Sequence, residues 1–138
     1  TEDEVALLNN VNTSKKHDDV RNIEEVISAS EIAEFRDTVL KVHVEEKLLT
    51  YIAQIVGETR ENASLYLGAS PRASIALLKA SKALAIVNGR DFVTPEDIKF
   101  LSKPVLRHRI ILTPEREMEG KTTDEIIEMI VNKIEVPR

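Results

Sequence analysis

The sequence predicts a mainly α-helical, compact bundle with a few short β segments. Apolar residues recur at helical spacing in several segments of the chain. Ser, Thr, Pro and Gly stand at positions that are typical of helix starts and ends. The intervening stretches that favour extended backbone are only a few residues long. Because such helices bury their apolar faces against one another, one helical domain is expected.

Composition excludes several classes of protein. The 138 residues are 42% hydrophobic and 31% charged, as is typical of a globular chain. Without cysteine, the chain can form neither a disulfide framework nor a thiolate metal site. The net charge of −5 opposes general nucleic-acid binding. No apolar run reaches the length of a membrane span and no signal peptide is visible, so we expect a cytoplasmic protein.

The N-terminal part predicts two helices joined by a polar linker. Residues 1–9 can form a short helix, with Thr1 as its N-cap and acidic residues near its positive end. The polar, turn-rich residues 9–19 predict an exposed linker. Ser28 or Ser30 can cap the next helix. The apolar stripe of that helix consists of Ile32, Phe35 and Val39.

The middle of the chain predicts two longer helices. Residues 45–60 have the clearest amphipathic pattern in the sequence. Residues 71–88 form the second helix, in which Ser70 is the expected N-cap and Pro71 fits the first helical position. Because Leu, Ile, Val and Ala cover nearly all faces of this helix, we expect it in the middle of the bundle, with Ala83 in the core.

Short extended segments and two further helices complete the prediction. Thr94 and Pro95, followed by two acids, start a helix that Pro104 ends or kinks. Thr122 or Thr123 caps the last helix. The apolar stripe of the last helix consists of Ile126, Ile127, Ile130, Val131 and Ile134. The segments that favour extended backbone are residues 41–44, 91–93 and 110–112.

Arg72 is a long cation in the first turn of an apolar helix. On spacing alone, two interpretations are open: a surface ion pair with one of the glutamates, or contact with a phosphate. A helix N-terminus presents free N–H groups and a positive dipole, and an arginine there adds charge where an anion would lie. A cation at this end is unfavourable by itself, so its presence calls for a compensating partner.

Three motifs follow one another between residues 67 and 110. They are Gly-Ala-Ser-Pro-Arg-Ala before an Ala/Leu-rich helix, Gly-Arg-Asp-Phe-Val-Thr-Pro-Glu-Asp, and Pro-Val-Leu-Arg-His-Arg. In this order they resemble the C-terminal lid of the MoxR family of AAA+ ATPases, and the resemblance extends over about residues 26–138. It implies two parts: residues 1–22, the end of an ATPase-core helix with a polar linker, and residues 23–138, the helical lid. Because the chain begins with Thr1 rather than Met, we expect a piece of a longer protein.

The resemblance also implies a role in ATP hydrolysis. Arg72 corresponds to the sensor-2 arginine, which contacts the γ-phosphate, and Ala69, Ser70 and Pro71 would line the nucleotide beside it. ATP and Mg²⁺ would be bound by the full-length protein, in rings that are usually hexamers. The implied partners are the upstream AAA+ core, neighbouring ring subunits and von Willebrand factor A-domain proteins, in chaperone-like remodelling.

The parts that hold and hydrolyse ATP are absent from this sequence. No Gly-x-x-x-x-Gly-Lys-Ser/Thr motif occurs in the 138 residues, and no strand is followed by paired acids that could bind magnesium. We therefore expect this chain alone to hold no cofactor and to have no ATPase activity.

The basic residues Arg107 and Arg109, with His108 between them, leave two interpretations open. They could contact a ring neighbour or nucleotide, or they could pair with acids such as Glu115 or Glu117. The histidines of the chain lie far apart without ligand spacing, so no metal site is expected.

Two alternatives from other functional classes remain at this stage. Residues 89–98 could be the short strand and final helix of a histone-fold-like DNA-binding module. The acidic balance opposes this interpretation, and the helix over residues 71–88 is short for the central helix of such a fold. The second alternative is a helical interaction domain without an ATPase role.

Overall fold

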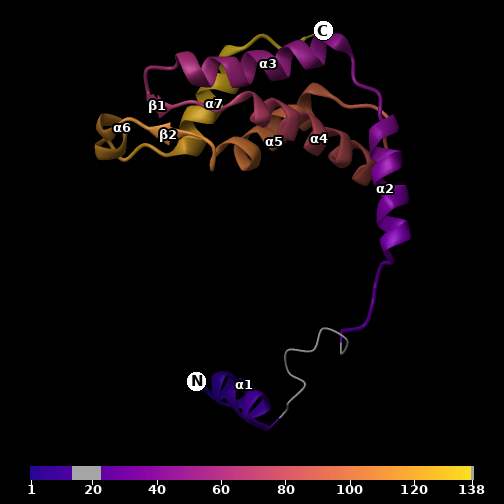
Figure 1. Cartoon of the computed structure of the whole chain (residues 1–138). Helices are drawn as coiled ribbons and strands as arrows, with labels where there is room; N and C mark the ends of the chain where they lie inside the picture. The colour runs from indigo at the N-terminus through magenta and orange to yellow at the C-terminus, as the bar shows by residue number, and fades with distance from the viewer. Residues whose placement is uncertain (14–22, 138) are drawn as a thin grey trace. The chain divides into compact units, whose positions relative to one another are not determined.

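The computed structural model describes residues 1–13 and 23–137, and these residues form seven helices and one two-stranded sheet (Figure 1). The prediction of a mainly α-helical fold with a few short β segments is confirmed. None of the described helices is both long and apolar enough to cross a membrane. The elements in chain order are α1 (Glu2–Thr13), α2 (Ala29–Lys41), α3 (Glu46–Glu61), β1 (Leu65–Leu67), α4 (Pro71–Val87), α5 (Pro95–Leu106), β2 (Ile111–Leu112), α6 (Pro114–Met118) and α7 (Thr123–Lys133).

The chain divides into two compact units, Thr1–Glu34 and Phe35–Arg138. The boundary between residues 22 and 23 that the resemblance implies stays a prediction. In the first unit, α1 continues to Thr13, whose hydroxyl donates a hydrogen bond to the backbone oxygen of Asn9 (2.7 Å). The predicted linker is therefore wrong for residues 9–13, where no Gly or Pro interrupts the helix. Its remainder, residues 14–19, lies outside the described residues.

The start of α2 confirms Ser28 as one of the two predicted caps. The Ser28 hydroxyl accepts a hydrogen bond from the Glu31 N–H (3.2 Å), and the Glu31 carboxylate accepts one from the Ser28 N–H (2.8 Å). This reciprocal pair is a capping box. No residue of α2 is buried within the part of the chain that the structure describes, although Ile32 and Phe35 lie on its predicted apolar stripe.

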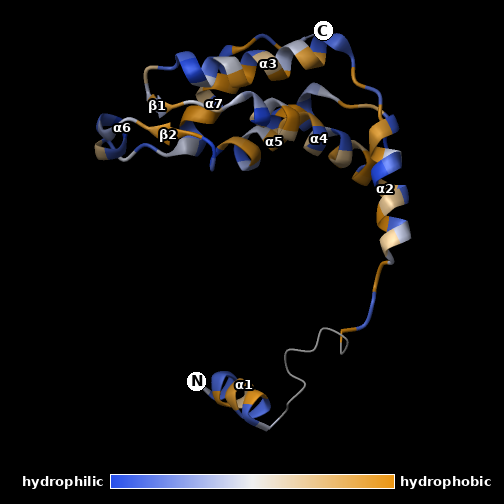
Figure 2. Cartoon of the chain, viewed as in Figure 1, coloured by the Kyte–Doolittle hydropathy of each residue, from blue (hydrophilic) through white to orange (hydrophobic). Residues whose placement is uncertain are grey.

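The core of the second unit lies among α3, α4, α5 and α7. Four of the five residues of the predicted stripe are confirmed as buried in α7, namely Ile126, Ile127, Ile130 and Val131. The fifth, Ile134, is the C-cap residue beyond α7 and is half-buried. Figure 2 shows hydrophobic and hydrophilic residues sharing each of these helices, which is the pattern of helices that bury one face. The buried residues of α3 are Leu48, Tyr51, Ile52, Ile55, Val56 and Thr59.

α4 is buried on one face, and the prediction that it is buried all round is wrong. Its buried residues recur at every fourth position: Ala73, Leu77, Ser81 and Ala85. Ile75 and Val87 are 55% and 81% exposed, and Ala83 is only half-buried. The physical reason is that α4 packs against α3 and α5, and the residues fully buried there lie along one stripe of α4. An apolar pattern on all faces could not reveal which side that would be.

The extended segments form one two-stranded sheet and one isolated β-bridge. β1 and β2 pair antiparallel, with Leu65 opposite Leu112 and Leu67 opposite Ile111. His43 and Phe92 form an isolated parallel bridge, which confirms the predicted extended segments before α3 and after α4. β1 and the five-residue α6 were not predicted, although Thr-Pro-Glu before α6 repeats the start signal of α5. Pro104 lies within α5, which ends two residues later.

Candidate functional site

The N-terminus of α4 carries no side-chain cap. Ser70 is the N-cap residue and Pro71 holds the first helical position, as the sequence predicts. The Ser70 hydroxyl, however, makes no capping hydrogen bond, whereas α5 and α7 both begin with complete capping boxes. The Ser70 backbone oxygen accepts a hydrogen bond from the Ala73 N–H (2.8 Å), which tightens the first turn. The first turn of α4 thus combines a fixed backbone with an uncapped positive end.

Arg72 projects from this turn and is exposed. Within residues 1–13 and 23–137, no hydrogen bond or ion pair joins the Arg72 guanidinium to another side chain or to the backbone. The surface ion pair with a glutamate, one of the two interpretations of this residue, is therefore not formed among those residues. An exposed guanidinium at the positive end of a helix dipole is chemically suited to an anion that carries several oxygens.

The loop of residues 68–70 connects β1 to α4 and is held against the last turn of α3. Ala69 is fully buried, while Ser70, Pro71 and Arg72 are exposed. Of the four residues that the resemblance places at the nucleotide, three therefore lie on the surface together. The side chain of Ala69 faces the protein interior instead, so it serves the packing of the loop.

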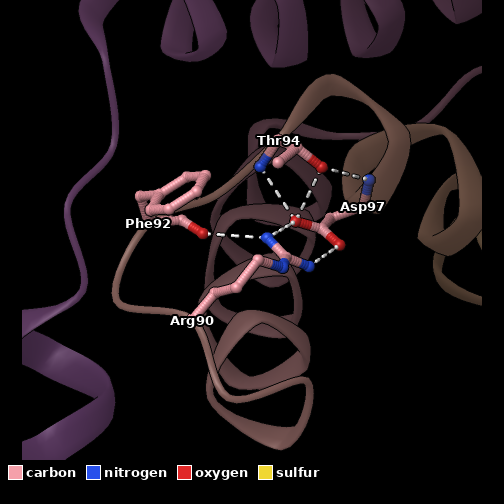
Figure 3. A network of polar contacts seen from close by, with 4 residues as sticks. All are labelled: Arg90, Phe92, Thr94 and Asp97. Atoms are coloured by element: carbon pink, nitrogen blue, oxygen red, sulfur yellow. Dashed lines mark hydrogen bonds and ion pairs between the residues drawn. The ribbon is translucent and has the colours of Figure 1, made fainter.

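A second polar centre lies at the other end of α4, between Arg90 and the start of α5 (Figure 3). The Arg90 guanidinium donates two hydrogen bonds to the Asp97 carboxylate, at 2.9 and 2.6 Å, and a third to the backbone oxygen of Phe92 at 2.9 Å. The Asp97 carboxylate also accepts hydrogen bonds from the N–H and hydroxyl of Thr94, at 2.8 and 3.0 Å. The predicted Thr94 cap is confirmed, within a complete capping box.

Charge in this network is set by two opposing effects on Asp97. Burial acts to raise the pKa of the Asp97 carboxyl, but the hydrogen bonds from Arg90 and Thr94 outweigh burial and hold the pKa below its ordinary value of 3.8. The hydrogen bond from Arg90 to Asp97 raises the pKa of the guanidinium. Both groups are therefore charged near neutral pH, and the network stabilises the turn between α4 and α5.

Comparison with known proteins identifies the fold. A family model described as AAA lid domain matches residues 57–130. The chain belongs to the AAA lid domain family. The match includes the 68–70 loop, all of α4 and the network around Asp97, and it favours the lid interpretation over the histone-fold-like alternative.

Relatives of the lid include MoxR proteins, as the motifs predict. The uncharacterized protein YeaC of Bacillus subtilis is 35% identical over 130 residues, which are 94% of this chain and 41% of YeaC. Chaperone MoxR1 of Mycobacterium tuberculosis is 28% identical over 83% of this chain and 33% of its own length. A crystal structure from Cytophaga hutchinsonii, of a protein assigned as an ATPase, matches all of this chain and 44% of its own, with 35% identity and a TM-score of 0.78. The lid thus spans less than half the length of each of these relatives.

The basic residues after α5 of the lid form local contacts. The Arg107 guanidinium lies 3.0 Å from the Asp124 carboxylate and donates a hydrogen bond to the backbone oxygen of Lys103. Arg109 donates to the backbone oxygen of Val105 at 3.0 Å. Ion pairing of Arg107 with an acid, one of the two open interpretations, is thus observed. The partner is Asp124 of α7, and the sequence neighbours Glu115 and Glu117 are not the acids that Arg107 contacts.

Carboxylate and imidazole groups of the lid do not gather around a common point. Among the described residues, no three of His, Cys, Asp or Glu are arranged so that they could hold a metal ion. The lid side of the candidate site offers the cationic Arg72 guanidinium, which suits phosphate oxygens.

Proposed function

We propose that this lid closes over ATP held by an upstream AAA+ core, and that Arg72 contacts the γ-phosphate. The observation that carries the proposal is the exposed Arg72 at the uncapped N-terminus of α4. Membership in the AAA lid domain family supports the same role. Ser70 and Pro71 lie exposed beside Arg72 and would face the nucleotide with it.

The chemistry of this contact follows from charge and geometry. The Arg72 guanidinium can donate two parallel hydrogen bonds to phosphate oxygens, and such charge-assisted bonds are stronger than neutral ones. The α4 N-terminus adds the positive end of its dipole. The phosphate-binding loop and the ligands for Mg²⁺ would come from the upstream core, because this sequence contains no such motif.

Loss of the γ-phosphate would release Arg72 and with it the lid. The angle of the lid would thereby depend on whether ATP or its hydrolysis product is bound. Neighbouring subunits of a ring would sense this change, and the resemblance suggests that the ring is a hexamer. We propose that this coupling drives chaperone-like remodelling of partner proteins in the cytoplasm, with von Willebrand factor A-domain proteins as the partners that the MoxR resemblance suggests. One of the similar proteins bears the name chaperone MoxR1.

Steady-state ATP hydrolysis by the natural protein that carries this lid tests the proposal. Arg72→Ala should lower kcat, and Arg72→Lys should rescue poorly because lysine lacks the planar fork of arginine. Equal activity of the Lys variant and wild type would contradict a two-pronged contact of Arg72 with phosphate.

A further inference from the structure

We propose that Thr59 is a positioning residue for Arg72 and acts through the 68–70 loop. The inference rests on the proposed contact between Arg72 and the γ-phosphate. Thr59 lies in the last turn of α3 and is only 1% exposed. Its side chain is therefore part of the protein interior, and any influence on nucleotide must pass through the groups that it touches.

The Thr59 hydroxyl joins α3 to the loop by two hydrogen bonds. Its hydrogen is donated to the backbone oxygen of Val56, at 2.6 Å. A lone pair of the same oxygen accepts the N–H of Ala69, at 2.9 Å. Because the proton is committed to Val56, the oxygen faces Ala69 as an acceptor. A buried backbone N–H needs such a partner, so this one contact fixes where the loop lies on α3.

Arg60 supplies a second anchor to the same residue. Its Nη1 donates a hydrogen bond to the backbone oxygen of Ala69, at 3.0 Å. Both polar backbone groups of Ala69 are thus bound by consecutive residues of α3. The two hydrogen bonds hold the two peptide units that flank the Ala69 Cα, so they limit rotation of the loop as well as its translation.

Gly68 lets the loop approach α3 at backbone distance. A methyl group on Gly68 would overlap the backbone oxygen of Thr59 and would lie 2.6 Å from the Cα of Arg60. Both obstacles are backbone atoms of a helix, which cannot turn aside as the end of a flexible side chain could. Glycine is therefore required here for close approach.

Only Ser70 and Pro71 separate Ala69 from Arg72. The proline ring fixes φ of Pro71, and the hydrogen bond from Ala73 to the Ser70 oxygen closes the first turn of α4. Few free torsions remain between the anchored peptide and the arginine backbone. A displacement of Ala69 is consequently transmitted to the guanidinium, and a misplacement of about 1 Å at a reacting centre can lower a rate by roughly 100-fold.

The kinetic test uses the natural protein that carries this lid. Thr59→Val removes the hydroxyl at nearly constant volume, and Thr59→Ser keeps it. We expect Thr59→Val to lower kcat for ATP hydrolysis roughly 10- to 100-fold with KM for ATP little changed, whereas Thr59→Ser retains most of the activity. Ser102→Ala is the matched control, because the Ser102 hydroxyl is equally buried but, among the described residues, bonds only the backbone oxygen of Ile98 within α5. It should leave kcat unchanged.

A double variant separates positioning from general destabilisation. If Thr59 acts through Arg72, Thr59→Val combined with Arg72→Ala should be no slower than Arg72→Ala alone. Hydrogen exchange gives a readout that does not depend on activity: the Ala69 amide should exchange faster in Thr59→Val and at the wild-type rate in Ser102→Ala.

The outcomes distinguish this inference from the proposed function. Wild-type kcat in Thr59→Val, or losses that multiply in the double variant, would overturn the positioning role while leaving the contact of Arg72 intact. Wild-type kcat in Arg72→Ala would overturn both. If Thr59→Val does not fold, Arg60→Gln carries the test, because Arg60 is exposed and its replacement leaves no cavity. The inference is supported if Arg60→Gln lowers kcat in the otherwise wild-type protein but causes no further decrease in the Arg72→Ala variant. An unchanged kcat in Arg60→Gln overturns the inference.

Discussion

The guanidinium of Arg90 forms a bidentate ion pair with the carboxylate of Asp97: Nη1 donates to Oδ2 at 2.9 Å and Nη2 donates to Oδ1 at 2.6 Å. The side chain of Asp97 is only 6% exposed and that of Arg90 26% exposed, so water screens this pair less than a surface ion pair. The same carboxylate completes the capping box of α5 with Thr94. One buried acid therefore joins the end of α4 to the start of α5.

Asp97→Ala should destabilise the lid by about 2 kcal/mol. The substitution leaves the Thr94 N–H without its capping acceptor and Arg90 without its partner, and unsatisfied polar groups of this kind cost about 1–3 kcal/mol each when buried. Urea unfolding of the lid measures the change. Glu96→Ala, at the exposed neighbouring position, is the control and should change the free energy of unfolding by no more than about 0.5 kcal/mol. Equal effects of the two substitutions would contradict the network.

The pH dependence of stability should carry the signature of Asp97. Its folded-state pKa lies below the ordinary value of 3.8, so its contribution is fully present above that value and is lost as the pH falls through the lower folded-state pKa. Between neutral pH and acid below about pH 4, the wild-type lid should therefore lose more stability than Asp97→Ala does. Urea unfolding across this pH range is the measurement. Parallel losses in the two proteins would show that Asp97 is not held in its charged form.

Thr94→Ala should cost about 1 kcal/mol, because Thr94 Oγ1 accepts the Asp97 N–H at the start of α5. The structure offers a matched control. Thr113 occupies the same N-cap position before Pro114, but its side chain makes no capping hydrogen bond. Thr113→Ala should therefore have a smaller effect on the free energy of unfolding. A larger effect at Thr113 than at Thr94 would refute the assignment of the cap.

Overpacking should reveal which face of α4 is buried. Ala85→Leu places extra atoms at a fully buried position and should cost roughly 1–3 kcal/mol. Ala83→Leu adds the same atoms at a half-buried position and should cost less. Urea unfolding should give a lower midpoint for Ala85→Leu than for Ala83→Leu. The reverse order would contradict the assignment of the Ala85 face of α4 as the face that packs against α3 and α5.

Local signals made the helix starts predictable. Thr94 with Asp97 and Thr122 with Glu125 are residues three apart whose contacts form within one helical turn, so the sequence alone indicates them. The apolar stripe of α7 was predictable for the same reason, because helical periodicity decides which residues share a face.

Contacts across loops were not predictable in this way. Arg90 and Asp97 are joined by a turn whose path depends on tertiary packing, and the acid that Arg107 contacts lies on a different helix from the acids near it in sequence. The contact between Thr59 and Ala69 likewise needs the approach of the 68–70 loop to α3. Position in the sequence identified Arg72, but the anchors of its loop emerge only from the fold.

The lid alone should neither hydrolyse ATP nor bind it with micromolar affinity. The sequence lacks the glycine-rich phosphate-binding motif, and one arginine at a helix N-terminus supplies only part of a nucleotide site. Isothermal titration of the purified lid with ATP measures this. A Kd near 1 µM, equivalent to about −8 kcal/mol, would mean that the lid itself contains most of the nucleotide site.

The kcat of ATP hydrolysis by the natural protein with Arg72→Ala, measured beside Lys79→Ala, tests the central claim most directly. Lys79 is an exposed cation of the same helix, away from the N-terminus, so it controls for the loss of surface charge. If Arg72 contacts the γ-phosphate, Arg72→Ala should lower kcat on the order of 10³-fold, with an unchanged circular dichroism spectrum, while Lys79→Ala stays active. Wild-type kcat in a well-folded Arg72→Ala protein would contradict the account.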